Sequence, residues 1–158
     1  MNRDNPWWII DIKPPIRLGK IDNGDLPRFL TNMHQLFPED AILYAEAPYM
    51  CVCFESFLKH NKLETSVKTK ISILHSDGFH IPLNRRNLAE LADILDGHSA
   101  SEVCELLVAY KGETVLMECS DVHNGIFEVS GEISEETVRN FCSLRGFSYR
   151  KSNAEQFK

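Results

Sequence analysis

Three short apolar segments in the second half of the chain are separated only by turns that contain glycine. They span residues 104–110, 113–122 and 126–129, with Lys111-Gly112 and Asn124-Gly125 between them. Glycine and asparagine tolerate the positive φ angles of two-residue hairpin turns, so this pattern predicts a three-stranded meander. Adjacent hairpins of this kind favour an α+β fold over a doubly wound fold, in which strands and helices alternate strictly.

The rest of the chain adds helices and further strands to the meander. Apolar residues at helical spacing predict four helices, and short apolar stretches predict strands. The helices are expected over 26–37, 50–60, 84–97 and 134–146, and the strands over 7–12, 41–47, 67–74, 79–83 and 147–149. We therefore predict an α+β fold with a mixed or antiparallel sheet, built largely from hairpins, and about four helices packed on it. Residues 1–158 should form a single domain, with 1–6 and 152–158 frayed.

Composition narrows the classes of function. The chain has 158 residues, of which 43% are hydrophobic, and a formal net charge of −6. Negative charge disfavours nucleic-acid binding, because that affinity comes mainly from Lys and Arg neutralising phosphates. No apolar run is long enough to span a membrane and the first residues lack signal-peptide features, so a cytoplasmic protein without membrane contact is expected. Nucleotide-binding, zinc-protease and serine-hydrolase motifs are absent, and no cofactor is expected.

Charge is distributed unevenly along the sequence. Residues 101–136 contain nine carboxylates and one cation, Lys111, whereas residues 59–87 contain six Lys or Arg and two carboxylates. We interpret the acidic stretch as the contact surface for a protein partner, which predicts a non-enzymatic binding or regulatory module. The residues of this predicted surface are Glu105, Glu113, Glu118, Asp121 and Glu128. With two-residue turns, Glu105 would lie opposite Glu118 and Asp121 opposite Glu128.

Other functions fit the same sequence. Asp121, His123 and Glu128 on one face could bind a divalent metal ion, or supply the acid and base of a hydrolytic enzyme. His75 and His80 would lie opposite each other across a predicted hairpin and could share a metal ion. Self-association is a further interpretation, in which the basic segment of one subunit contacts the acidic segment of another.

Arg85 and Arg86 occupy the first turn of the helix predicted over 84–97. Positive charge is unfavourable at that end of the helix dipole, by about a few tenths of a kcal/mol for each residue. A bound anion, held by free N–H groups and the two guanidiniums, would offset this cost. The alternative is that both arginines face water or pair with carboxylates of the meander.

The five cysteines are Cys51, Cys53, Cys104, Cys119 and Cys142. An odd number without paired Cys-x-x-Cys spacing is typical of reduced thiols in a protein core. On a helix, Cys51 and Cys53 would lie about 200° apart around the axis, so they are not expected to bind one ion together. Cys119 or Cys142 could act as a nucleophile only beside a histidine that is adjacent in space.

Overall fold

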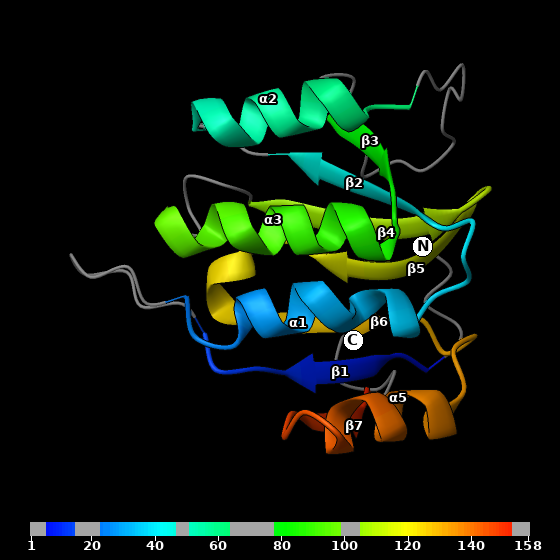
Figure 1. The fold of residues 1–158 in the computed structure, drawn as a ribbon. Coiled ribbons are helices and arrows are strands. Elements are labelled where there is room, and N and C mark those ends of the chain that lie inside the picture. The colour runs from blue at the N-terminus through cyan, green and yellow to red at the C-terminus, as the bar shows by residue number, and fades with distance from the viewer. Residues whose placement is uncertain (1–5, 15–22, 47–50, 64–77, 99–104, 153–158) are drawn as a thin grey trace.

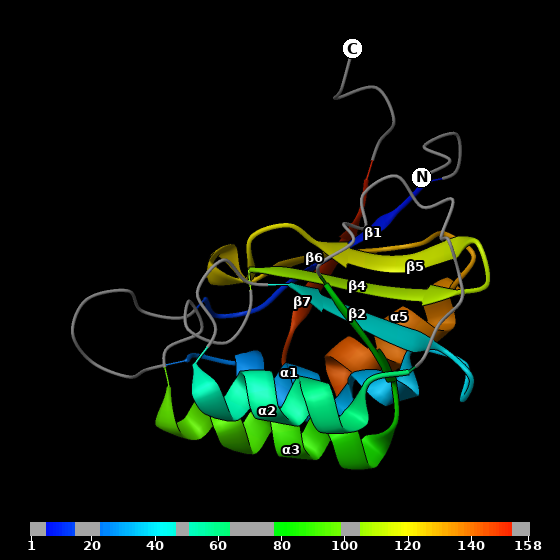
Figure 2. The same ribbon diagram turned by 90° about the horizontal axis from the view of Figure 1, so that it is seen from above.

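The described residues form a seven-stranded sheet with four helices on one of its faces (Figures 1 and 2). The computed structural model describes residues 6–14, 23–46, 51–63, 78–98 and 105–152. The strand order is β3-β2-β4-β5-β6-β1-β7, and every pairing is antiparallel. The predicted α+β class is confirmed, and the sheet is antiparallel throughout rather than mixed.

The elements lie close to the segments in which the sequence predicted them. The strands are β1 (Trp8–Asp11), β2 (Ile42–Glu46), β3 (Phe79–Pro82), β4 (Leu106–Lys111), β5 (Thr114–Cys119), β6 (Ile126–Val129) and β7 (Ser148–Lys151). The helices are α1 (Leu26–Asn32), α2 (Val52–Asn61), α3 (Arg85–Gly97) and α5 (Glu135–Ser143), with 3-10 turns η1 (Met33–Gln35) and η2 (Val122–Asn124). The strand predicted over 67–74 lies outside the described residues.

Side-chain caps fix where two of the helices begin. Asn84 Oδ1 accepts a hydrogen bond of 2.9 Å from the Asn87 backbone N–H at the start of α3. Ser134 Oγ accepts one of 3.1 Å from the Thr137 N–H at the start of α5. Each bond satisfies a backbone donor that has no partner within the helix, which explains why both helices begin at the predicted residue.

The main core lies between the helices and the sheet, and Phe29 of α1 is at its centre. The Phe29 side chain is fully buried. Its ring stacks on Phe127 of β6 with 4.0 Å between centroids, and it meets Phe141 of α5 edge-on at 5.6 Å. One residue therefore joins two helices to the middle of the sheet.

The hairpin between β4 and β5 turns one residue later than the sequence predicted. Lys111 pairs with Thr114 across Gly112 and Glu113, and a bulge follows between Ala109 and Tyr110. A bulge inserts one extra residue into a strand and shifts every later pair. Val108 is consequently the residue opposite Glu118, and the predicted pairing of Glu105 with Glu118 is wrong.

The connection between β5 and β6 is longer than the two-residue turn that was predicted. The 3-10 turn η2 and Gly125 fill this connection. The paired residues of β5 and β6 therefore lie further from the connection than a two-residue turn would place them. Glu118 pairs with Glu128. The predicted opposition of Asp121 and Glu128 is therefore wrong.

The chain remains hydrogen-bonded as far as Ser152, whose N–H donates to the Trp7 carbonyl at 2.6 Å. Frayed ends are predicted over 1–6 and 152–158; of these residues only Pro6 and Ser152 are described, and the rest lie outside the described residues. None of the helices in the described part of the chain is both long and apolar enough to cross a membrane.

Candidate functional site

Two of the predicted contact residues point away from the helices. In β5, Met117 and Cys119 belong to the main core, so Glu118 between them faces the opposite side of the sheet. The neighbours of Glu128 in β6 are likewise core residues, and Glu128 faces the same way as Glu118. All four described helices contribute to the core on the other side.

Glu118 and Glu128 lie directly opposite each other on paired strands. Glu118 also opposes Val108, and Glu128 opposes Ile9 of β1. Both carboxylates are half-buried, and Ser120 Oγ donates a hydrogen bond of 3.0 Å to Glu118. Two carboxylates opposite each other concentrate negative charge on this face of the sheet, and a cationic group of a partner would be attracted to it.

The other three predicted contact residues lie at the ends of the meander strands. Glu105 is exposed just before β4, and the Val122 N–H donates to its carbonyl at 3.3 Å. Asp121 lies at this same end, where Asn124 Nδ2 donates to its carboxylate at 2.9 Å. Glu113 is exposed in the turn at the opposite end of β4 and β5. The five residues therefore do not form one compact patch.

Apolar side chains flank the pair of carboxylates. Ile126, two residues before Glu128, is 40% exposed, and Ile9 on β1 is half-buried. We call Ile9, Glu118, Ile126 and Glu128 the acidic sheet surface. Its combination of carboxylates with the exposed Ile126 and the half-buried Ile9 is suited to a partner that offers both a cation and an apolar contact.

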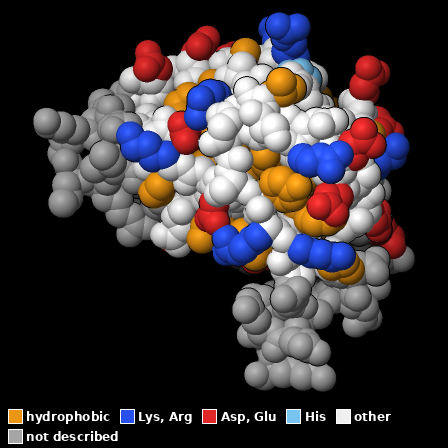
Figure 3. Space-filling model, turned by 90° about the horizontal axis from the view of Figure 1, so that it is seen from below, with side chains coloured by type: hydrophobic (Ala, Val, Ile, Leu, Met, Phe, Trp, Pro, Cys, Tyr) orange, Lys and Arg blue, Asp and Glu red, His pale blue; other side chains and the backbone are white. Residues whose placement is uncertain are grey.

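Charge is mixed or positive on other parts of the molecule. From the side of α5 and β7, cationic and acidic side chains are interspersed (Figure 3). At the end of α2 and the start of α3, which lie side by side, the exposed cations are Lys59, Lys62, Arg85 and Arg86 (Figure 1). These residues, which we call the basic end, belong to the helix layer. The described cations of the basic end thus lie in the helix layer, whereas Glu118 and Glu128 lie on the opposite face of the sheet.

His80 of β3 packs between two tyrosines on the sheet face opposite the helices. Its Nδ1 lies 2.7 Å from Tyr110 Oη, and its ring centroid lies 5.1 Å from that of Tyr44. Burial lowers the pKa of His80 and raises the pKa of Tyr110. The fold therefore favours the neutral imidazole. His75, its predicted metal-binding partner, lies outside the described residues.

We expect His80 to make the protein less stable in weak acid. The folded-state pKa of His80 is lower than that of the unfolded chain, so the unfolded chain binds more protons as the pH falls below about 6.5. The melting temperature should therefore decrease between pH 7 and pH 5. In the His80→Gln variant this decrease should be smaller. Identical pH profiles for wild type and His80→Gln would show the prediction to be wrong.

The alternative enzyme site is only partly described. Glu128 lies opposite Glu118 rather than Asp121, and the side chain of His123, which belongs to η2, is not described. An enzyme centred on Asp121, His123 and Glu128 therefore has no support from the described side chains. Arg85 is exposed, as is Arg86, at the N-terminus of α3, and anion binding there stays a prediction.

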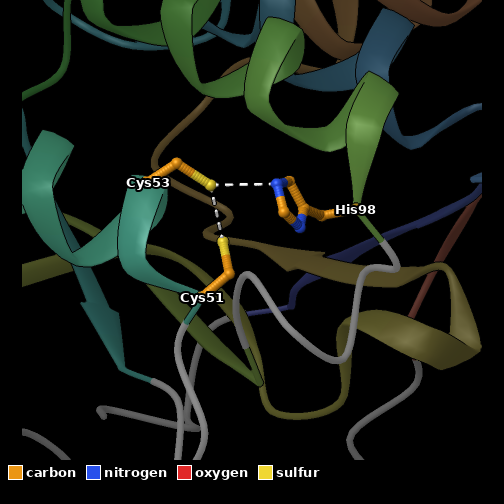
Figure 4. Close-up of side chains that lie close together, drawn as sticks. All are labelled: Cys51, Cys53 and His98. Carbon is orange, nitrogen blue, oxygen red and sulfur yellow. Dashed lines mark hydrogen bonds between the residues drawn. The ribbon is translucent and has the colours of Figure 1, made fainter.

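Three side chains from two helices meet at a position that the sequence did not predict (Figure 4). Cys53 Sγ, in the first turn of α2, lies 3.0 Å from Cys51 Sγ and 3.0 Å from Nε2 of His98. His98 is the C-cap residue that directly follows α3. Among the described residues, this is the one group of three possible metal-ligating side chains whose donor atoms all lie within 4.8 Å of one another.

The expectation that Cys51 and Cys53 could not bind one ion together is wrong. It assumed that both residues are helical, whereas Cys51 is the N-cap of α2 and has the extended angles φ −65° and ψ 152°. An extended residue directs its side chain differently from a helical one, which allows the two sulfur atoms to meet. Both thiols are also partly exposed, so the prediction of core thiols fails for this pair.

The remaining described cysteines are buried and poorly suited to act as nucleophiles. Burial raises the pKa of Cys119 to about 12 and that of Cys142 to about 11. Because the thiolate is the nucleophile, neither is reactive near neutral pH. These two residues confirm the prediction of core thiols, and Cys104 lies outside the described residues. Burial also raises the pKa of the Cys51 thiol, and its hydrogen bond with Cys53 adds to that effect.

Sequence signals for the cysteine and histidine cluster were present but weak. Cys51 directly precedes the apolar stripe of α2, which is where an N-cap is expected, and His98 directly follows the glycine that ends α3. Neither signal shows that the start of one helix lies beside the end of the other.

The structure defines an α+β protein with an open antiparallel sheet, an acidic sheet surface and a cluster of two thiols and an imidazole. No protein-family model, curated protein or solved structure matches the chain. Its function must therefore be inferred from its own residues.

Proposed function

We propose that this protein is a non-enzymatic binding module that uses the acidic sheet surface to contact a protein partner. The observation that carries the proposal is the direct opposition of Glu118 and Glu128 on the sheet face away from the helices. The partner would present Lys or Arg side chains next to an apolar residue, because Ile9 and the exposed Ile126 flank the carboxylates.

Electrostatics would act mainly on the rate and specificity of such an encounter. Nine carboxylates against one cation in residues 101–136 give this part of the chain a negative field, and opposite charge on the partner would be attracted to it. A carboxylate pair by itself supplies little affinity at an exposed site. The aliphatic side chains would therefore supply the apolar contact, and the charges would select a basic partner.

We place the protein in the cytoplasm as part of this proposal. The partly exposed thiols of Cys51 and Cys53 are free, and a reducing compartment keeps such thiols free.

We expect a basic peptide to bind at the acidic sheet surface. The probe is a short synthetic peptide of alternating lysine and leucine, titrated into the isotope-labelled protein while amide chemical shifts are recorded. The largest shifts should fall in β5, β6 and β1. The double variant Glu118→Gln with Glu128→Gln should bind about three- to tenfold more weakly at low salt and should show a flatter salt dependence.

A matched variant separates this surface from general charge attraction. Glu90→Gln with Asp93→Asn removes the same charge from exposed positions on α3 and should bind the peptide as the wild type does. Equal weakening by both double variants would contradict the proposal. A native mass that falls as salt rises, in the absence of peptide, would identify the partner as a second copy whose basic end meets this surface.

A further inference from the structure

We propose that Cys51, Cys53 and His98 bind a zinc ion. This inference goes beyond the partner-binding proposal and does not depend on it, because the three residues lie at the end of the helix layer rather than on the acidic sheet surface (Figure 4). Two sulfur donors and one imidazole nitrogen form a donor set that suits Zn²⁺ and disfavours Mg²⁺ or Ca²⁺, which prefer oxygen.

The distances between the donor atoms are close to those of a tetrahedral zinc site. Zn–S bonds of about 2.3 Å and Zn–N bonds of about 2.0 Å place donors about 3.5–3.8 Å apart. Cys53 Sγ lies 3.0 Å from both Cys51 Sγ and His98 Nε2. Each pair would have to separate by about 0.5–0.8 Å to admit the ion. All three side chains are partly exposed, so movements of that size need no rearrangement of the core.

The ends of two helices favour this chemistry electrostatically. Cys51 and Cys53 lie at the N-terminus of α2, where the positive end of the helix dipole would favour the negative charge that the sulfur atoms carry once a metal ion has displaced their protons. His98 lies at the C-terminus of α3, where the dipole favours positive charge. The ion would therefore lie between a helix end that stabilises its anionic ligands and one that stabilises the cation.

Asn23 holds the position of His98. Its side-chain amide is buried and donates to the carbonyl of His98 at 3.0 Å, and it also donates to the carbonyl of Leu95 in the last turn of α3. These bonds fix the backbone from which the imidazole projects. Fixing a ligand through neighbouring hydrogen bonds is a general property of metal sites and reduces the entropy lost when the ion binds.

Zinc would connect segments that are distant in sequence. Cys53 and His98 are 45 residues apart, so the ion would close a long loop by joining the start of α2 to the end of α3. Binding displaces the two thiol protons into solvent, which leaves a neutral unit of one Zn²⁺, two thiolates and one imidazole. The three described donors leave one coordination position for water or another ligand.

Metal content and zinc affinity of the full-length protein test the proposal. The untagged protein is purified under reducing conditions without chelator, and its zinc is measured. The metal-free protein is then titrated with Zn²⁺ against a chromophoric chelator, and separately with Co²⁺. We expect one zinc ion per chain, a Co²⁺ spectrum with thiolate charge-transfer and tetrahedral bands, and a higher melting temperature with zinc.

Single substitutions assign the ligands. Cys51→Ser, Cys53→Ser and His98→Gln should each weaken zinc binding by more than about 100-fold and abolish the zinc-dependent rise in melting temperature. His60→Gln and Cys119→Ala, at a histidine and a thiol outside the cluster, should bind as the wild type does. Far-UV circular dichroism verifies that each variant is folded. Wild-type affinity no higher than that of Cys53→Ser, or a Co²⁺ spectrum unchanged by all three ligand substitutions, would overturn the proposal.

Discussion

Replacing Phe29 with alanine is expected to lower the free energy of unfolding by about 3–5 kcal/mol. The ring is fully buried and contacts Phe127 of the sheet and Phe141 of α5. Its removal would leave a cavity where two helices meet the sheet. It would also remove the favourable interaction between the Phe29 ring and its two aromatic neighbours. A domain of this size is stable by about 5–15 kcal/mol, so this one change would remove at least about a fifth of the total.

Urea unfolding measures this loss, and a conservative variant controls for it. Phe29→Leu keeps most of the apolar volume and should cost less than about 2 kcal/mol. The midpoint of Phe29→Ala should fall while the slope of the transition stays constant, because the substitution hardly changes the amount of surface that unfolding exposes. A loss below about 1 kcal/mol for Phe29→Ala would show that the aromatic cluster is not packed as described.

Gly125→Ala should destabilise the protein by about 2–3 kcal/mol. Gly125 has φ 65°, in the left-handed region that disfavours a side chain. An added Cβ would also lie 2.7 Å from the backbone oxygen of Ile12, a contact that no folded chain tolerates without a shift. The backbones are held at this distance by the Ile12 N–H, which donates to the Gly125 carbonyl at 2.9 Å.

Gly112→Ala separates the cost of a side chain at positive φ from the cost of the steric contact with a neighbouring backbone. Gly112 has a similar φ of 57°, but a Cβ there would meet nothing within 4 Å. Its replacement should cost only the backbone strain of a side chain at positive φ, about 1 kcal/mol of unfolding free energy. Both free energies can be measured by urea unfolding. Equal losses for the two variants would contradict a close approach between β1 and the start of β6.

The sequence predicted the type and approximate position of the described elements because the evidence for each is local. The apolar stripe of α3 and the capping residues Asn84 and Ser134 act within a few residues of their position. Strand order and register depend on contacts between distant segments. A β4–β5 turn displaced by one residue, a bulge at Ala109 and a 3-10 turn after β5 were enough to change which carboxylates face each other.

The cysteine cluster was missed for a related reason. Cys51 lies one position before the helix and has extended angles, so the helical spacing that would separate it from Cys53 does not apply. A shift of one residue at a helix end changes the direction of a side chain completely. The proximity of His98 depends on the antiparallel packing of α2 and α3, which no local pattern contains.

The position of β1 between β6 and β7 has a consequence for the order of folding. Trp8 pairs with Val129 and with Lys151, so the first strand has both of its partners in the last third of the chain. During synthesis, β2, β3 and β4 can pair with one another long before β6 leaves the ribosome, whereas β1 must wait. Closure over such separations is slow compared with local pairing, so insertion of β1 should be the late step in folding.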